Sequence, residues 1–290
     1  MKEEKIFNWI IFFVLSVIWG SSFILTKVCS IQLNGWQIGS IRIFFAGLIF
    51  LPFAVFHIRG IPRSKISFVI LSGFLGNFFP AFLFAIAIEK KIESSLAGIL
   101  NSLTPLFVIL IAILFFKAKI KLKKIAGVLI GFAGLLILNF STGGMTLNNF
   151  GFILLILLAT IFYGFNVNIV SYYLKEVEPF KIATVSLTIM GILGGIIMWQ
   201  QDVFSIAKYD EGARISIIYA GLLGIVGSAF ATALFYILIK RAGGLFASLV
   251  TYGIPVIAIF WGLIAHENVT VLQISCLALI LLGVYLANRN

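Results

Sequence analysis

The feature that most constrains this sequence is a series of ten long apolar segments separated by short polar connections. An α-helix needs about 20 mainly apolar residues to cross the hydrocarbon core of a bilayer. The strands of a membrane barrel would alternate polar and apolar residues, and these segments do not. We therefore predict an all-α integral membrane protein with ten transmembrane helices, at residues 6–26, 36–56, 66–88, 94–116, 123–140, 150–173, 180–200, 214–239, 245–265 and 270–288.

Composition excludes a soluble protein, because 61% of the 290 residues are hydrophobic and only 11% are charged. Soluble domains typically carry about 25% charged residues. The net charge of +11 does not indicate nucleic-acid binding, since the basic residues form short clusters between the apolar segments. The first apolar run is also longer than the core of a signal peptide, about 7–15 residues. We expect it to remain as the first membrane helix.

The basic residues also predict the orientation in the membrane. If the N-terminus lies inside, the inner connections hold 15 Lys and Arg residues and the outer connections hold 5. Cytoplasmic loops of membrane proteins carry the excess of Lys and Arg. We predict that both termini are cytoplasmic.

The two halves of the chain match each other in the same order along all five predicted helices. The spacing between matched residues is 144 at first and about 150 after an insertion near residues 202–214, which we expect to be a loop. Because five is an odd number, the second copy must enter the membrane from the opposite side. We predict two inverted five-helix repeats, residues 1–145 and 146–290, with a substrate site between them near the midplane. The matches include Trp19 with Tyr163, Gly47 with Gly191, Gly76 with Gly227, Phe84 with Phe235, Pro105 with Pro255, and Gly134 with Gly283.

Motifs in the fourth and fifth helices of each half carry a family resemblance. The first half has Ser94 to Pro105 and then a glycine-rich run from Gly127 to Gly134, and the second half has Tyr252-Gly-Ile-Pro255, Ala265-His-Glu267 and Gly283 to Leu286. This pattern resembles the EamA family of the drug/metabolite transporter superfamily over nearly the whole chain. One position departs from it, because Lys117 stands where the first half should have an acidic residue. A role that needs this carboxylate in both halves is therefore not expected.

The resemblance implies export or uptake of amino acids, related metabolites or drugs across the inner membrane. The leading hypothesis is a secondary transporter that exports an amino acid or a related compound by alternating access. The alternatives are uptake or exchange of a nucleoside-like or vitamin-like metabolite, and a channel. The expected partners are a small-molecule substrate and the lipid bilayer, with no nucleic acid, and the chain is expected to be a monomer or a weak homodimer.

The sequence offers no set of residues for catalysis or metal binding. His57 and His266 lie at predicted helix ends on opposite sides, and Cys29 and Cys276 have no metal-binding spacing. We therefore expect no enzyme, no metal and no cofactor. No Asp or Glu lies in the middle of a predicted helix, which favours facilitated or exchange transport, or coupling through backbone and hydroxyl oxygens, over a carboxylate proton relay.

Polar and aromatic residues inside the predicted helices are candidates for the substrate site, because polar groups in hydrocarbon are costly without a partner. Trp19 and Tyr163 occupy matched positions, as do Asn77 with Ser228 and Asn101 with Thr251. Contacts between helices explain the same residues equally well. The predicted substrate-binding residues are Trp19, Asn77, Asn101, Tyr163, Asn166, Ser228, Thr251 and Tyr252.

Arg42 and three prolines complete the candidates. Arg42 lies about six residues into the second predicted helix, and its side chain either contacts an anion such as a substrate carboxylate or extends to the interface along its apolar stem. Pro80, Pro105 and Pro255 are predicted to kink or gate their helices, since proline removes a backbone donor. We expect the last two to leave backbone carbonyls free for a substrate or water.

Overall fold

The structure is a computed structural model that describes residues 2–90, 92, 94–141, 150–264 and 271–288. In this part of the chain all regular structure is helical, and helices lie over each of the ten predicted segments. Six of the segments form one helix each, namely α1 (Lys2–Cys29), α2 (Gly35–His57), α7 (Leu122–Ser141), α8 (Phe150–Tyr172), α9 (Pro179–Gln200) and α15 (Val271–Asn288).

The other four segments are interrupted, and they are the third and fourth of each half. The third consists of α3 (Arg63–Gly73), the π-helical turn η2 (Phe74–Phe78) and α4 (Phe79–Glu89), and the fourth of α5 (Ser94–Asn101) and α6 (Thr104–Phe116). The eighth consists of α11 (Glu211–Leu222), the π-helical turn η4 (Leu223–Phe230) and α12 (Ala231–Ala242), and the ninth of α13 (Gly244–Ser248) and α14 (Val250–Ile264).

Two short helices lie in connections. The 3-10 turn η1 (Ile58–Gly60) follows α2, and α10 (Val203–Tyr209) occupies the insertion between α9 and α11. The insertion is therefore not the irregular loop that we expected. Its apolar residue Val203 is buried, and this packing stabilises a helix that is too short to be stable alone.

Seven helical runs of the described chain are long and apolar enough to cross a bilayer, and two shorter apolar runs are Gly244–Ile257 and Ala278–Ala287. Large apolar side chains such as Phe56, Leu114 and Ile218 are exposed around the bundle. An exposed apolar surface of this kind marks contact with lipid or protein. The chain is a multi-pass membrane protein. The seven long runs are Glu3–Cys29, Gly35–Gly60, Arg63–Glu89, Leu96–Phe116, Gly151–Tyr172, Pro179–Gln200 and Glu211–Ala242.

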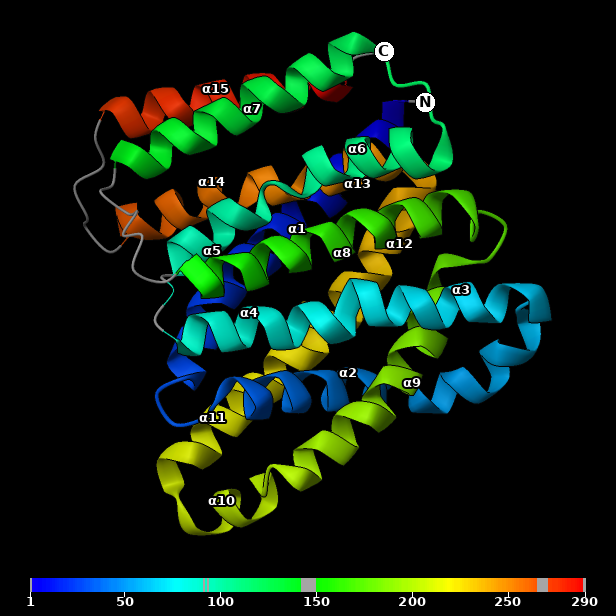
Figure 1. Ribbon diagram of the computed structural model, residues 1–290, viewed down its shortest axis with the longest axis vertical. Helices are drawn as coiled ribbons and strands as arrows, with labels where there is room; N and C mark the ends of the chain where they lie inside the picture. The colour runs from blue at the N-terminus through cyan, green and yellow to red at the C-terminus, as the bar shows by residue number, and fades with distance from the viewer. Residues whose placement is uncertain (1, 91, 93, 142–149, 265–270, 289–290) are drawn as a thin grey trace.

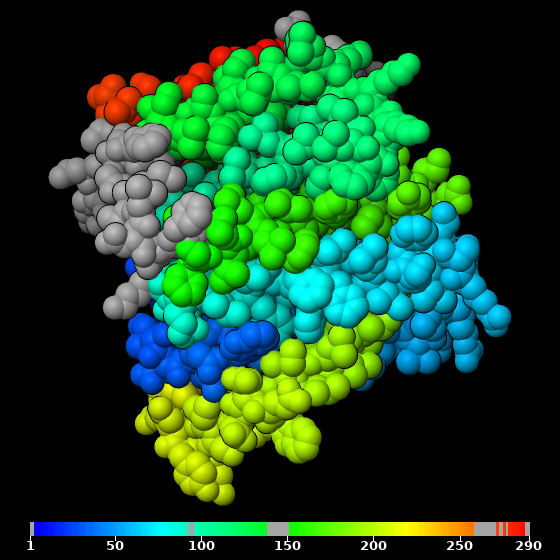
Figure 2. All heavy atoms as spheres, in the orientation of Figure 1, coloured from blue at the N-terminus to red at the C-terminus, as the bar shows by residue number. Residues whose placement is uncertain are grey.

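Helices that are distant in sequence pack side by side. The helix α2 lies along α9 and α7 lies along α15, while α1 packs against α14 and α6 against α8 (Figure 1). Glycines permit the two closest pairs. A Cβ atom on Gly47 would lie 2.5 Å from the Cα atom of Gly191, and a Cβ atom on Gly283 would lie 2.5 Å from that of Gly131. On the visible face, side chains of neighbouring helices fill the gaps between the ribbons (Figure 2).

Two ends of the bundle can be distinguished. The start of α1 and the end of α15 lie near the marked chain ends, toward the same side as the α2–α3 and α8–α9 connections (Figure 1). We call this the terminal side. The α1–α2 connection lies at the opposite side, where Asn34 and Gln37 form a capping box that fixes the start of α2. The Glu89 carboxylate accepts a hydrogen bond from Gly35 N at 2.9 Å and ties this start to α4.

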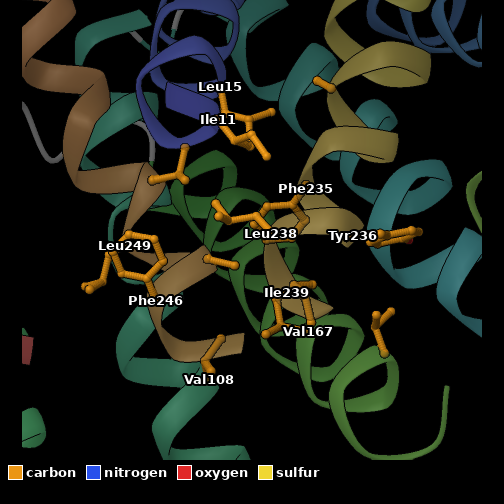
Figure 3. Packing of buried hydrophobic residues seen from close by; sticks show 14 of the residues in the cluster. Ile11, Leu15, Val108, Val167, Phe235, Tyr236, Leu238, Ile239, Phe246 and Leu249 are labelled. Carbon is orange, nitrogen blue, oxygen red and sulfur yellow. The ribbon is translucent and has the colours of Figure 1, made fainter. Parts of the chain in front are cut away.

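A set of buried apolar side chains fills the terminal side between the two halves of the chain. These side chains belong to α1, α6, α8, α12 and α13 and to Leu249, which follows α13. They pack against one another (Figure 3). We call it the terminal-side cluster, consisting of Ile11, Leu15, Val108, Val167, Phe235, Leu238, Ile239, Phe246 and Leu249.

Candidate functional site

A cavity lies between the helices, next to the terminal-side cluster. It encloses about 840 Å³ of space free of protein atoms, part of it open to the outside. Both halves of the chain contribute to its wall, through α1, α2, α4, α5, α6, α8, α12, α13, α14 and the two π-helical turns. The described lining residues are Trp19, Ser22, Phe23, Thr26, Arg42, Gly76, Asn77, Ala81, Phe84, Ile88, Asn101, Thr104, Tyr163, Asn166, Gly227, Ser228, Thr232, Phe235, Tyr236, Ser248 and Thr251.

On α1 and α4 the described lining of the cavity extends toward the side of the α1–α2 connection. Thr26 lies three residues before the end of α1, and Ile88 lies one residue before the end of α4. Toward the terminal side the lining on α1 stops at Trp19, and Leu15 and Ile11 of the terminal-side cluster follow on the same helix. On α1, apolar side chains of the terminal-side cluster therefore lie between the cavity and the terminal side.

The structure brings together seven of the eight predicted substrate-binding residues, and Arg42 lies with them. The exception is Tyr252, which is fully buried outside the cavity. Its hydroxyl donates a hydrogen bond to Val128 O at 2.8 Å, and its ring packs where a Cβ atom on Gly131 would collide with it. Tyr252 therefore joins α14 to α7. The seven lining residues are Trp19, Asn77, Asn101, Tyr163, Asn166, Ser228 and Thr251.

The two π-helical turns present polar residues to the cavity. The amide of Phe79 donates to Phe74 O, and the amide of Ala231 donates to Val226 O, so each bond skips one residue more than in an α-helix. Such turns are rare and often occur at functional sites. Asn77 lies in η2 and Ser228 in η4, at positions that the sequence comparison of the halves had matched. The sequence did not reveal the turns themselves.

Hydrogen bonds fix the orientation of several lining side chains. The Trp19 indole donates to Gly227 O at 3.0 Å, and the Thr232 hydroxyl donates to Asn77 Oδ1 at 2.8 Å. Asn166 Oδ1 accepts a bond of 2.8 Å from Ser72, and the Ser72 hydroxyl also lies 2.8 Å from the Tyr236 hydroxyl. Ser72, which we did not predict, therefore helps to orient Asn166 from behind the cavity wall.

Arg42 contributes a positive charge to the cavity. Its Nε donates to Ser228 Oγ at 2.7 Å, which joins α2 to η4. The side chain does not extend to the membrane interface, as one of our two alternatives had it, because it lines the cavity. None of the described lining residues is acidic. No described carboxylate forms an ion pair with Arg42; the pairs that are seen join Lys90 to Glu89 and Lys181 to Glu178.

Two amide atoms of the lining remain without a hydrogen-bond partner among the described residues. They are Asn77 Nδ2, a donor, and Asn101 Oδ1, an acceptor, and both are buried. Buried polar atoms in proteins are almost always hydrogen-bonded, so each unpaired one calls for an explanation. Both atoms belong to residues of the cavity wall.

Aromatic rings form the apolar part of the wall. The ring centroids of Trp19 and Phe235 lie 5.2 Å apart, and those of Phe23 and Phe84 lie 5.5 Å apart. Phe84 also stacks on Tyr163 at 6.2 Å. The site thus combines an aromatic wall with hydroxyl, amide and guanidinium groups.

The three prolines lie outside the cavity lining, and two carbonyls near them are not free. Proline at position i leaves the carbonyl of residue i−4 without its helical donor. For Pro105 this carbonyl is Asn101 O, which accepts a bond of 2.6 Å from the Thr104 hydroxyl. For Pro255 it is Thr251 O, which accepts a bond of 2.9 Å from the Ser102 hydroxyl. The structure thus corrects our expectation, since side-chain hydroxyls occupy both carbonyls. Pro80 follows η2 directly, at the first turn of α4.

No histidine or cysteine is among the described residues that line the cavity. His57 Nδ1 lies 2.9 Å from the Thr184 hydroxyl, between α2 and α9, and His266 and Glu267 lie outside the described residues. Cys29 and Cys276 are free and buried. Within the described part of the chain, no three His, Cys, Asp or Glu residues are placed to hold a metal ion.

Comparison with known proteins gives one family. The sequence profile described as the EamA-like transporter family matches residues 7–140 and again residues 151–289. An uncharacterized transporter of Archaeoglobus fulgidus is 24% identical over 98% of this chain and 99% of its own length. The uncharacterized inner membrane transporter YedA of Escherichia coli K12 is 24% identical over 94% of this chain and 88% of its own.

A further relative and a solved structure agree with these matches. The uncharacterized transporter YdfC of Bacillus subtilis is 28% identical over 66% of this chain and 62% of its own. A protein of known crystal structure superposes with a TM-score of 0.71 and covers 97% of both chains. At 15% sequence identity, this last similarity concerns the fold alone.

Proposed function

Because this chain belongs to the EamA-like transporter family, we propose that it is a secondary transporter that carries a small metabolite across the inner membrane by alternating access. The observation that carries the proposal is the cavity, which we infer to open toward the α1–α2 connection. It lies between the two halves, is lined by polar and aromatic residues, and is blocked toward the terminal side by apolar packing. A carrier needs such a site that is accessible from one side at a time.

Two inverted five-helix repeats, residues 1–145 and 146–290, explain the packing of the helices. A two-fold axis relates the contacts in pairs, and helices that lie next to the axis contact their own equivalents. In our assignment α2 is equivalent to α9 and α7 to α15, and these are the pairs that lie side by side. The contact of α1 with α14 likewise has its counterpart in that of α6 with α8. The two matches of the family profile, one in each half, support the same division.

In this proposal ten helices cross the membrane and both chain ends are cytoplasmic. The terminal side carries Arg59, Arg63, Lys175 and Lys181 in and beside its connections, in agreement with the excess of positive charge in cytoplasmic loops. The cavity then faces away from the cytoplasm in the conformation seen here. For the transport unit we propose a monomer, with a weak homodimer as the alternative.

The substrate class that we propose is an amino acid or a related small compound, and the direction is export. The aromatic wall accommodates an apolar side chain, and the amide and hydroxyl groups of the lining supply hydrogen bonds to a polar end. None of the described lining residues is a carboxylate that could relay protons. We therefore expect exchange or facilitated transport.

Counterflow in liposomes tests the function. Purified protein is reconstituted in vesicles loaded with a mixture of amino acids and related metabolites, and the external solution is analysed by mass spectrometry. A carrier gives saturable flux that is accelerated by substrate on the opposite side. Flux without saturation and without this acceleration would instead indicate a channel, and absence of any protein-dependent flux would contradict the proposal.

Paired variants test the site. We expect Trp19→Ala and Asn101→Ala to reduce transport at least tenfold, because both residues line the cavity. The controls are Phe13→Ala on α1 and Leu110→Ala on α6, whose side chains are exposed on the outside of the bundle. Equal loss in site variants and controls would mean that this cavity is not the substrate site.

A further inference from the structure

The guanidinium of Arg42 stands inside the proposed transport site in a fixed position. The capping box at Asn34 and the bond from Gly35 to Glu89 hold the start of α2. Arg42 follows Gly35 by seven residues, which corresponds to roughly 10 Å along a helix. Its Nε is occupied by the bond of 2.7 Å to Ser228 Oγ. The orientation of the planar group is thereby set by two elements, α2 and η4.

The outer edge of this guanidinium is available to a ligand. A guanidinium has five N–H donors, and the four on the two terminal nitrogens remain after Nε is bonded. No described residue accepts a hydrogen bond from them. Asn77 Nδ2, an unpaired buried donor, belongs to the same cavity wall. The site thus presents several N–H donors and a full positive charge to its interior.

An uncompensated charge at this depth calls for a counter-charge. A positive side chain within a membrane is costly, and it normally pairs or marks the path of a substrate. The described lining supplies no acidic residue. Two parallel N–H groups of a guanidinium match the two oxygens of a carboxylate. A single arginine neutralises one negative charge.

From these observations we infer that the transported substrate is a small organic acid with a net charge of −1, whose carboxylate binds Arg42. This inference rests on the proposed transport function and, within its substrate class, favours related acids over zwitterionic amino acids. The apolar part of the acid lies against the aromatic wall of Trp19, Phe23, Phe84 and Phe235. Cationic substrates are excluded by repulsion from Arg42.

A second cavity has a charge of the same sign. It lies at the ends of α6 and α8, beside the α6–α7 connection, and its lining includes Lys119, Lys121 and Lys124 with Asn168. None of its described lining residues is acidic. A concave surface with charges of one sign raises the local concentration of ions of the other sign. An anionic substrate would be attracted to this end of the bundle as well.

Pairs of acids and their neutral amides test the inference. The probes are 3-phenylpropionate, 4-methylpentanoate, phenyllactate and indole-3-acetate, each compared with its carboxamide, and binding to the purified protein is measured by calorimetry. We expect at least one acid to bind tenfold or more tightly than its amide. In Arg42→Gln this preference should vanish while affinity for the amide is kept, which also shows that the variant is folded.

Two further variants separate charge from geometry. Arg42→Lys retains the positive charge but lacks the two parallel N–H donors of a guanidinium. Ser228→Ala retains Arg42 but removes the hydroxyl that accepts the hydrogen bond from its Nε. Both should lower the affinity for the acid several-fold and leave that for the amide unchanged. Equal binding of all acids and amides, an unchanged preference in Arg42→Gln, or no binding of any acid in the panel would overturn the inference.

Failure of the carboxylate inference and failure of the transport proposal give different results. If counterflow shows saturable transport of a neutral or cationic metabolite that Arg42→Gln does not change, the carrier function stands and the carboxylate inference falls. If acids bind through Arg42 but no solute crosses the membrane in a saturable way, the carboxylate inference stands and the transport function falls.

Discussion

At the scale of single residues, neighbouring polar residues of one helix have different roles. Thr251 and Tyr252 are neighbours in α14, yet Thr251 lines the cavity and Tyr252 points to α7. Successive residues of a helix point about 100° apart, so adjacent side chains cannot share a face. The sequence pattern that grouped these two residues could not separate them.

The role of Tyr252 can be tested with Tyr252→Phe. Loss of the hydroxyl removes the bond to Val128 O, and a hydrogen bond of this kind contributes about 0.5–1.5 kcal/mol to stability. We expect a lower midpoint of thermal unfolding in detergent, with an unchanged KM for transport. Tyr285→Phe, at an exposed position of α15, is the control and should change neither value. A raised KM with unchanged unfolding would place Tyr252 in the site after all.

At the scale of elements, the third, fourth, eighth and ninth segments are interrupted, and they build the site together with the uninterrupted helices α1, α2 and α8. All four interrupted segments contribute lining residues, whereas the uninterrupted helices α7, α9 and α15 contribute none among the described residues. Irregular backbone within a membrane is tolerated where it lines a cavity or is buried in protein. The hydroxyls of Thr104 and Ser102 satisfy the carbonyls that Pro105 and Pro255 leave without donors.

A double-mutant cycle tests the link between Ser102 and Pro255. Ser102→Ala leaves the buried Thr251 O unpaired, which costs about 1–3 kcal/mol. In the Ser102→Ala/Pro255→Ala double variant, the new backbone N–H at position 255 can donate to Thr251 O. We expect the destabilisation by Ser102→Ala to be smaller in that background, measured by thermal unfolding. Strictly additive effects would mean that the two sites do not share this carbonyl.

The contact between α2 and α9 makes a second prediction at this scale. A Cβ atom on Gly47 would lie 2.5 Å from Gly191 Cα, so the helices must move apart in Gly47→Ala. Overpacking of this kind typically costs about 1–3 kcal/mol, and we expect a lower unfolding temperature. Gly151→Ala is the matched control, since a Cβ atom there would meet no other atom within 4 Å. Equal stability of the two variants would contradict the close approach.

At the scale of the whole molecule, the cavity and the terminal-side cluster together describe one state of a carrier. Ser22 lines the cavity, whereas Leu15, two turns earlier on α1, is fully buried in the cluster. In the opposite state of an alternating-access cycle, the cluster would separate and the other end would close. The inverted repeats that we propose would provide two similar arrangements of the halves for this exchange.

Cysteine labelling tests the exchange, in a background in which Cys29 and Cys276 are replaced by Ala. With a polar maleimide, Ser22→Cys should react rapidly and Leu15→Cys slowly in protein without substrate. Substrate at saturating concentration should increase the rate at Leu15→Cys and reduce that at Ser22→Cys, each at least threefold. Fast labelling of both positions at once would indicate a pore, and rates that never change would contradict alternating access.

What the sequence determined by itself is the helical class, the approximate position of the helices and most of the polar residues that line the candidate cavity. Long apolar segments are helical in a bilayer because only internal hydrogen bonding satisfies the backbone there. Polar residues within such segments stand out, which is why seven of the eight predicted substrate-binding residues do line the cavity. The sidedness of the loops and the division into two repeats remain predictions from the same sequence.

Only the tertiary structure decided which face of each helix meets the cavity. Helices of this kind are apolar on all sides, so no polar stripe separates a surface that faces lipid from one that faces a neighbour. The bond of Arg42 to Ser228, the π-helical turns and the outward position of Tyr252 relative to the cavity all depend on contacts between distant segments. Such contacts form only in the packed bundle, and no periodic pattern in the sequence predicts them.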